Sequence, residues 1–160
     1  MISLLSGSAN TWIGGRDYVT EGTWTWSDGT TWTWGSSDAP WKDGQPNNGA
    51  GSDGGGQNCV SMNSAGEWDD VRCDSTRQYM CEKPDSDQTQ LASNGACSCE
   101  TGWTASLDTG KCYKRLEELT TGVTWATADT NCKAAGANLA SITSALENKG
   151  QSFIISFVSL

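Results

Sequence analysis

The chain has 160 residues, which is enough for one domain with a sizeable core, and it carries a net charge of −9. This charge argues against binding to nucleic acid, whose phosphates need basic partners, and against binding to anionic membrane surfaces. An acidic chain with nineteen glycines and nine tryptophans suggests an extracellular or cation-binding protein whose loops pack over aromatic anchors.

Short strands are predicted in the first part of the chain. Residues 10–17 are predicted to be a buried strand that ends in a turn. Residues 23–26 and 31–34 alternate threonine with tryptophan around Ser27-Asp28-Gly29, a typical tight turn, which predicts two paired strands with the tryptophans on one face. We interpret these tryptophans as core residues, and an exposed platform for stacking on sugars is the alternative.

A long irregular loop region is predicted next. Residues 36–58 are dominated by proline, asparagine, aspartate and glycine, and a loop of this length inside a compact domain is usually functional or disordered. Three further strands are expected at residues 60–63, 67–72 and 78–83.

The composition changes at Pro84. Residues 84–98 are polar and aperiodic, which predicts a linker. A small disulfide-closed hairpin is predicted within residues 99–114, and two helices and a short extended segment at 139–142 are predicted after it. The first helix is indicated by apolar residues at helical spacing from Trp125 to Ala135, and the second by the capping box of Ser144 and Glu147. Residues 153–158 would be the buried stripe of that second helix, or a strand.

Seven cysteines indicate an oxidising compartment and disulfides. A zinc cluster is the rival interpretation, but the chain has no histidine and no C-x-x-C pair. The odd count leaves one cysteine unpaired or available for a disulfide to another chain.

The chain shows neither a secretion signal nor a run long enough to span a bilayer. A disulfide-type chain without a signal suggests a fragment of a larger extracellular protein. Enzyme activity is not expected, because the chain has no histidine and no nucleophile elbow.

Residues 45–70 contain the strongest candidate site. The stretch combines Gln45-Pro46-Asn47, a glycine-rich loop, Cys59, and the adjacent aspartates Asp69 and Asp70 behind a tryptophan. Oxygen donors from two separated segments could converge there on a hard cation, which is the chemistry of a calcium site.

Together these motifs resemble the C-type lectin-like domain. In residues 1–83 the matching motifs are Trp12-Ile13-Gly14-Gly15, Trp24-x-Trp26-x-Asp28-Gly29, Gln45-Pro46-Asn47, Asn58-Cys59-Val60, Trp68-Asp69-Asp70, Cys73 and Tyr79-Met80-Cys81-Glu82. In residues 99–160 they are Gly102-Trp103, Cys112-Tyr113, Trp125-x-x-Ala128-x-x-x-Cys132, Gly136-x-x-Leu139-Ala140-Ser141-Ile142 and Glu147-Asn148. The resemblance implies an α+β, disulfide-stapled fold.

The two halves stand in reverse order compared with the family. Residues 1–83 resemble its C-terminal, calcium-loop half, whereas residues 99–160 resemble its N-terminal, two-helix half. Residues 2–5 and 155–158 also resemble each other at an offset of 153, about one domain plus a linker. We therefore expect a tandem-repeat fragment, whose parts either fold as two half-domains or dock as a circularly permuted domain.

The resemblance also implies disulfides. It implies Cys59–Cys73 across the loop and an N-terminal hairpin bridge, here Cys99–Cys112 with Cys97 as a rival or the leftover. A bridge from the first helix to the last strand could join only Cys81 and Cys132 within this chain.

The family's calcium and sugar ligands correspond to five residues. The carbohydrate-binding and metal-ligating candidates are Gln45, Asn47, Gln57, Asp69 and Asp70. Residue 57 is glutamine where the family usually has glutamate, and the side-chain charge of the set comes only from the two aspartates. Calcium binding is therefore expected to be weak, on the order of 10⁻⁴ to 10⁻³ M. The triplet mixes mannose-type and galactose-type patterns, so the sugar class stays open.

The expected function is a carbohydrate-binding, weakly calcium-dependent C-type lectin module in a secreted or cell-surface tandem protein, with glycans or glycoproteins as partners. The alternative is a protein-interaction or structural module without sugar binding. Ice or mineral binding is a further option.

Overall fold

The computed structural model describes residues 10–35, 37–50, 55–85, 99–106, 108–116 and 122–157, except the side chains of 153–157. The strands are β1 (Thr11–Arg16), β2 (Thr25–Trp26), β3 (Cys59–Met62), β4 (Trp68–Val71), β5 (Gln78–Pro84), β6 (Thr104–Ser106), β7 (Lys111–Leu116) and β8 (Asn138–Leu139). The helices are α2 (Trp125–Ala134) and α3 (Ala145–Phe157). Most of the predicted linker, and Cys97, lie outside the described residues.

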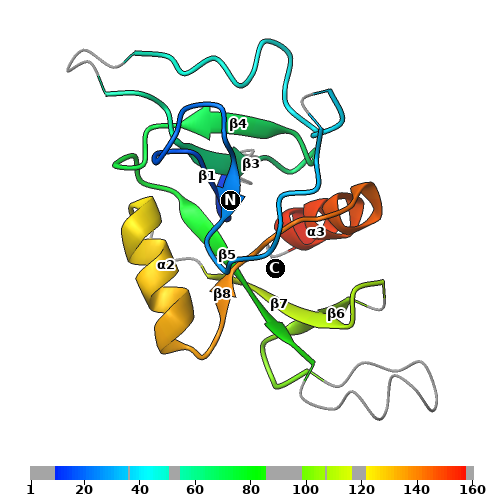
Figure 1. Ribbon diagram of the computed structural model, residues 1–160. Helices are drawn as coiled ribbons and strands as arrows, with labels where there is room; N and C mark the ends of the chain where they lie inside the picture. Colours follow the sequence, from blue (N-terminus) through cyan, green and yellow to red (C-terminus); the bar gives the residue numbers. More distant parts are fainter. Residues whose placement is uncertain are drawn as a thin grey trace, which may run out of the picture.

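One mixed sheet joins the two parts of the chain. Its strand order is β4-β3-β1-β5-β7-β6, with β2 added to β1 and β8 added to β5. Strand β5 pairs in parallel with β1 and antiparallel with β7 and β8. The helices α2 and α3 lie on opposite sides of β5 (Figure 1). The predicted α+β class is confirmed, and the segment after residue 98 packs against the segment before residue 86.

Atoms of neighbouring segments pack closely against β1 at Gly14 and Gly15 and leave no room for a side chain there. A Cβ atom on Gly15 would lie 2.6 Å from Cγ2 of Val60, and one on Gly14 would lie 3.0 Å from the carbonyl oxygen of Leu139. Side chains at these two positions would therefore push β1 away from β3 and from the start of the 139–142 segment. Trp12 and Ile13, which precede the glycines, are fully buried.

The prediction of a strand at residues 31–34 is wrong. Strand β2 pairs with β1 instead of with this segment. The alternation itself holds, because the threonines at 31 and 33 are exposed while the tryptophans at 32 and 34 turn inward. Side-chain bonds replace ladder pairing: Trp34 Nε1 donates to the carbonyl oxygen of Ile142, and Thr33 Oγ1 donates to that of Thr143.

Six of the nine tryptophans form one aromatic cluster around Trp68. The ring of Trp68 lies 5.4 to 5.7 Å from four other indole rings in edge-on geometry, those of Trp26, Trp32, Trp34 and Trp41. Trp68 and Trp26 are buried, and the others are half-buried. The interpretation of these residues as core is correct for the centre of the cluster, which has an accessible rim.

The two predicted helices are present, and α3 begins at the predicted capping box. Thr124 caps α2 by accepting a hydrogen bond from the Thr127 backbone, and Gly136 follows its end with φ of +68°. Ser144 Oγ accepts a hydrogen bond from the Glu147 backbone at the start of α3. Residues 153–157 are helical, so the strand alternative is wrong there, and the predicted buried stripe lies outside the described side chains.

Three disulfides fasten this arrangement. They are Cys59–Cys73, Cys81–Cys132 and Cys99–Cys112, the same pairs that the resemblance implies. The second joins β5 to α2 and so links the two parts of the chain across 51 residues.

A buried polar network also crosses between the two parts. Lys111 Nζ of β7 lies 3.0 Å from Glu82 of β5 and 3.2 Å from Glu147 of α3. Tyr113 donates to Glu147 at 2.6 Å, and Ser141 donates to Glu82 at 2.6 Å. Two carboxylates thus share one ammonium group, and the network carries an excess negative charge only when both carboxylates are ionised. Burial raises the pKa of Glu82 to about 7, although Lys111 and Ser141 oppose the shift.

This network predicts that stability falls as pH rises. The folded-state pKa of Glu82 lies above its unfolded value of 4.5, so its stabilising contribution is complete below pH 4.5 and is lost as pH rises through about 7. The free energy of unfolding should lose about 3 kcal/mol from this group between pH 4.5 and pH 8. Denaturant titrations of Glu82→Gln should lack this component. Glu100→Gln, an exposed carboxylate paired with Lys83, is the matched control and should keep it. Equal pH dependence in both variants would contradict the assignment.

Candidate functional site

The Gln45-Pro46-Asn47 triplet folds onto Asp70. The Gln45–Pro46 peptide bond is cis. The backbone N–H of Asn47 donates to both carboxylate oxygens of Asp70, at 3.1 and 3.0 Å, and the N–H of Asn48 donates to Oδ2 at 2.6 Å. Asp70 is 1 % exposed. The buried carboxylate therefore holds the triplet against strand β4.

Gln57 closes the other side of the loop. Its Oε1 accepts from the backbone N–H of Gly49 at 2.6 Å, and Asn47 Oδ1 accepts from the same N–H at 2.8 Å. The backbone N–H of Gln57 donates to Asn48 Oδ1 at 2.8 Å. The structure thus brings Asn47, Gln57 and Asp70 together with the adjoining Gln45, four of the five residues that the resemblance selected.

Asp69 stands apart from this hydrogen-bonded group. Burial and the charge of Asp70 raise the pKa of Asp69, whereas Lys42 and Arg77 lower it. The carboxylate therefore sits between a negative and two positive neighbours. Lys42 and Arg77 partly neutralise the charge of Asp69, which is one of the two carboxylates predicted to bind a cation.

The chemistry of the donors fits a hard cation. Gln45 Oε1 is buried without a hydrogen-bond partner among the described residues, and the amide oxygens of Asn47 and Gln57 and the carboxylate of Asp70 are the other donors. Calcium accepts such oxygens, although few charges lower its affinity. No group of three or more histidine, cysteine or acidic side chains suited to a metal occurs in the described part of the chain. Most of the donors here are neutral amides.

Asp17 is a further acidic residue at this end of the sheet that the sequence analysis missed. It follows β1, is 2 % exposed, and its Oδ1 has no hydrogen-bond partner within the described ranges. Burial raises the pKa of Asp17, the N–H of Gly22 opposes this, and the charges of Glu21 and Asp70 add to the rise. The sequence did contain a signal for this residue, because Asp17 and Glu21 are acidic, stand four positions apart and directly follow a buried strand.

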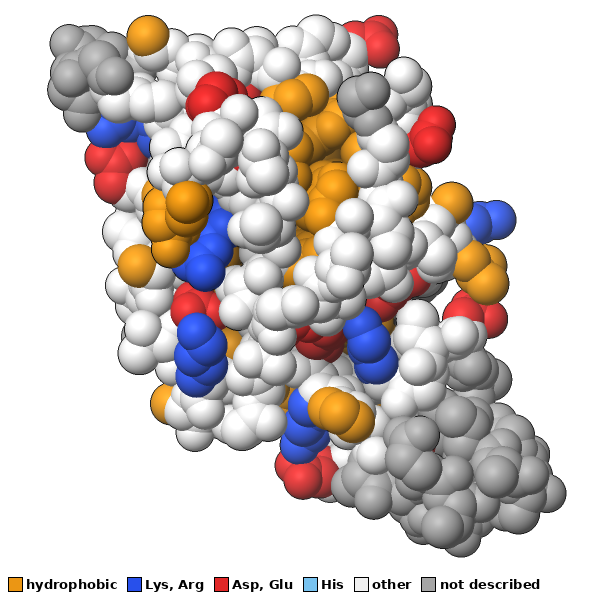
Figure 2. Space-filling view, in the orientation of Figure 1, with side chains coloured by type: hydrophobic (Ala, Val, Ile, Leu, Met, Phe, Trp, Pro, Cys, Tyr) orange, Lys and Arg blue, Asp and Glu red, His pale blue; other side chains and the backbone are white. Residues whose placement is uncertain are grey.

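A hollow lined by tryptophans adjoins the triplet. It has a volume of about 460 Å³, and its lining includes Pro46 and the indoles of Trp24, Trp32, Trp34 and Trp41. Figure 2 shows hydrophobic side chains gathered in a hollow on the upper half of the molecule's face. The rim of the aromatic cluster therefore borders the candidate cation site.

Comparisons with known proteins identify a family for part of the chain. The sequence model of the Lectin C-type domain family matches residues 2–83, just over half of the chain. A hepatic lectin of Gallus gallus is 42 % identical over 73 residues, which cover 46 % of this chain and 32 % of that protein. The galactose-specific lectin nattectin of Thalassophryne nattereri is 36 % identical over 85 residues, 52 % of this chain and 48 % of that protein.

Solved structures give a similar partial match. The carbohydrate-recognition domain of the mouse scavenger receptor C-type lectin is 36 % identical, and the match covers 44 % of this chain and 51 % of that one with a TM-score of 0.37. The matched part therefore spans about a third to a half of the hepatic lectin, nattectin and this receptor domain. With its matching family model and homologues, the chain belongs to the C-type lectin family, a family of non-enzymatic binding proteins.

Proposed function

We propose that the chain is a carbohydrate-binding module with weak calcium dependence, part of a larger extracellular tandem protein whose partners are glycans or glycoproteins. The observation that carries this proposal is the convergence of Gln45, Asn47, Gln57 and Asp70, with Gln45 Oε1 buried and unpartnered among the described residues. The adjoining tryptophan hollow supports a sugar ligand, because aromatic faces stack on the apolar faces of sugars.

The domain organisation belongs to the same proposal. Residues 1–83 are the calcium-loop half and residues 99–160 the two-helix half of a C-type lectin-like domain, joined by the linker 84–98. The pairing of β5 with β7 and β8 and the Cys81–Cys132 disulfide support docking as a permuted domain. In a tandem protein, several such modules would raise a weak single-site affinity through multivalency.

An extracellular location accords with the disulfides. No helix in the described ranges is long and apolar enough to cross a membrane.

Calorimetric titration with calcium tests the site. We expect heat from calcium with a dissociation constant on the order of 10⁻⁴ to 10⁻³ M, followed by binding of mannose or galactose only when calcium is present. Asp70→Ala should abolish the calcium heat, because it removes the buried carboxylate that holds the triplet. Asp43→Ala is the matched control, since Asp43 is exposed in the same loop outside the donor set. Calcium heat that survives in Asp70→Ala would refute this site.

A protein-interaction or structural module is the second candidate. It is favoured by the backbone N–H groups that already occupy both oxygens of Asp70, and by Lys42 and Arg77 beside Asp69. Absence of calcium heat in the unmodified protein, together with calcium-independent capture of a deglycosylated protein, would establish this alternative.

A further inference from the structure

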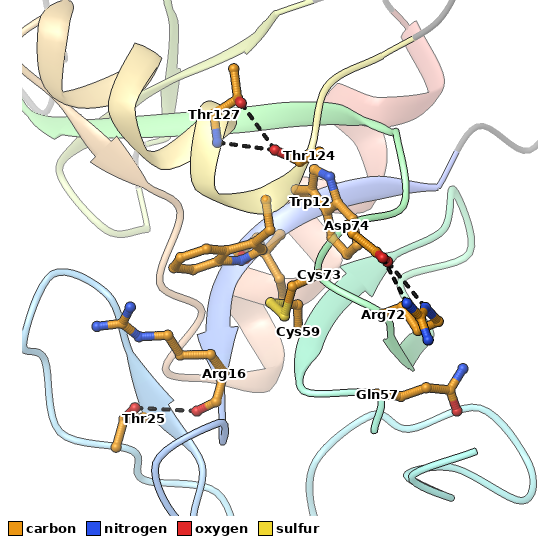
Figure 3. Close-up of a disulfide and its surroundings, with 12 residues drawn as sticks. Trp12, Arg16, Thr25, Gln57, Cys59, Arg72, Cys73, Asp74, Thr124 and Thr127 are labelled. Carbon is orange, nitrogen blue, oxygen red and sulfur yellow. Dashed lines mark hydrogen bonds and ion pairs between the residues drawn. A yellow bond between two sulfur atoms is a disulfide. The ribbon is translucent and has the colours of Figure 1, made fainter. Parts of the chain in front are cut away.

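A second cavity lies beside the Cys59–Cys73 disulfide. It has a volume of about 530 Å³, and its lining includes Arg16, Tyr18, Arg72, Asp74 and Trp125. Figure 3 shows the side chains of Arg16 and Arg72 on either side of this disulfide. Residues 56 and 58 line the cavity while Gln57 between them belongs to the calcium-loop site, so the two sites share a wall.

Arg16 gives this cavity an uncompensated positive charge. Its guanidinium lies 4.7 Å from the ring centroid of Tyr18 and 5.2 Å from that of Trp125, in cation–π contact with both. No carboxylate among the described residues forms an ion pair with it, although the chain has 19 acidic residues. By contrast, Arg72 lies 2.7 Å from Asp74. These two contacts restrict the position of the guanidinium, and an anion could accept hydrogen bonds from its N–H groups.

The N-terminal end of α2 also favours an anion, and Asp74, the acidic residue of the cavity lining, is paired with Arg72. Trp125 and Ala126, in the first turn of α2, line the cavity, and that turn contains no acidic residue. The N-terminal end of a helix attracts negative charge.

We propose that this cavity binds the carboxylate of an acidic saccharide such as a uronic acid. The planar guanidinium of Arg16 suits a bidentate bond to a carboxylate. The ring of Tyr18, which is 54 % exposed at the rim, offers a surface on which the sugar can stack. The saccharide class rests on the proposed function and the shared wall, whereas the carboxylate rests on Arg16 and the groups around it.

A pair of sugars that differ only in the carboxylate tests this inference. The probes are methyl β-D-glucuronide and methyl β-D-glucoside, titrated into the whole chain with and without calcium and followed by NMR at the indole N–H of Trp125, which donates to Ile13. We expect the glucuronide to bind at least about tenfold more tightly than the glucoside, in chelator as well as in calcium. If the loop site bound no calcium, the glucuronide would still be expected to bind more tightly than the glucoside. The experiment can therefore contradict either proposal without contradicting the other.

Variants identify the residue responsible. Arg16→Gln should weaken glucuronide binding about tenfold and leave glucoside binding unchanged, whereas Arg16→Lys should recover only part of the loss. Lys149→Gln removes one exposed positive charge on α3 and should bind as the unmodified protein does. Equal affinity for the two sugars, acetate binding as tight as glucuronide binding, or no movement of the Trp125 signal would each overturn the inference. The Trp125 measurement uses the unmodified protein and decides the question even if an Arg16 variant does not fold.

Discussion

Replacing Trp68 with alanine is expected to lower the free energy of unfolding by about 4 kcal/mol. Trp68 is fully buried and contacts four other indoles at the centre of the aromatic cluster. Its Nε1 also donates to Asn148 Oδ1 of α3 at 2.8 Å, while Asn148 Nδ2 donates to the carbonyl oxygen of Gly66. The truncation would therefore open a cavity and leave Asn148 Oδ1 without its hydrogen-bond donor. It would also weaken the contact between α3 and β4.

Chemical denaturation followed by far-ultraviolet circular dichroism measures this effect without relying on tryptophan emission. Trp68→Phe should cost clearly less than Trp68→Ala, because it keeps part of the ring volume but not the bond to Asn148. Trp103→Ala is the matched control: Trp103 is half-buried beside Lys83 and Lys114, and its loss should cost about 1 kcal/mol. Equal losses in Trp68→Ala and Trp103→Ala would contradict a central role for Trp68.

Removal of the Cys81–Cys132 disulfide is expected to have an effect of similar size. The bond closes a loop of 51 residues between β5 and α2, and such a closure contributes about 4 kcal/mol in the chain-entropy account. Both cysteines are fully buried, so replacement of the pair by alanine avoids leaving new polar groups in the core. Hydrogen exchange should report the loss most strongly in α2 and β7, which lie in the part of the chain that this bond fastens to β5.

The hairpin disulfide provides a control for this experiment. Cys99–Cys112 spans only 13 residues, so its replacement by alanines should cost less, about 3 kcal/mol, with the loss of protection confined to β6 and β7. Peptide mapping of the unmodified protein should find Cys81 bonded to Cys132. Both of these cysteines in reduced form would be incompatible with this packing of the two parts of the chain.

The candidate site was predictable in its residue types and less so in its geometry. Proline, amide and aspartate motifs at 45–47 and 69–70 indicated oxygen donors, and Asn47, Gln57 and Asp70 do lie together. That pattern gave no indication that Lys42 and Arg77 would oppose the charge of Asp69, because these residues come from a loop and from another strand end. Asp17 was missed for the same reason, since its proximity to Asp70 arises only when β1 lies beside β3.

The sequence by itself determined the family, most of the strand segments, the cap at the start of α3 and the disulfide-bearing character of the chain. These features depend on local chemistry: β-branched and aromatic residues in strands, capping side chains, and cysteines at particular places along the chain. Tertiary structure decided that residues 31–34 leave the sheet, because Trp34 and Thr33 bond to the backbone of the 142–143 segment about 110 positions away. It also decided that β5 joins both parts of the chain and that Arg16 meets Trp125 beside a cavity, since these contacts depend on packing between distant segments.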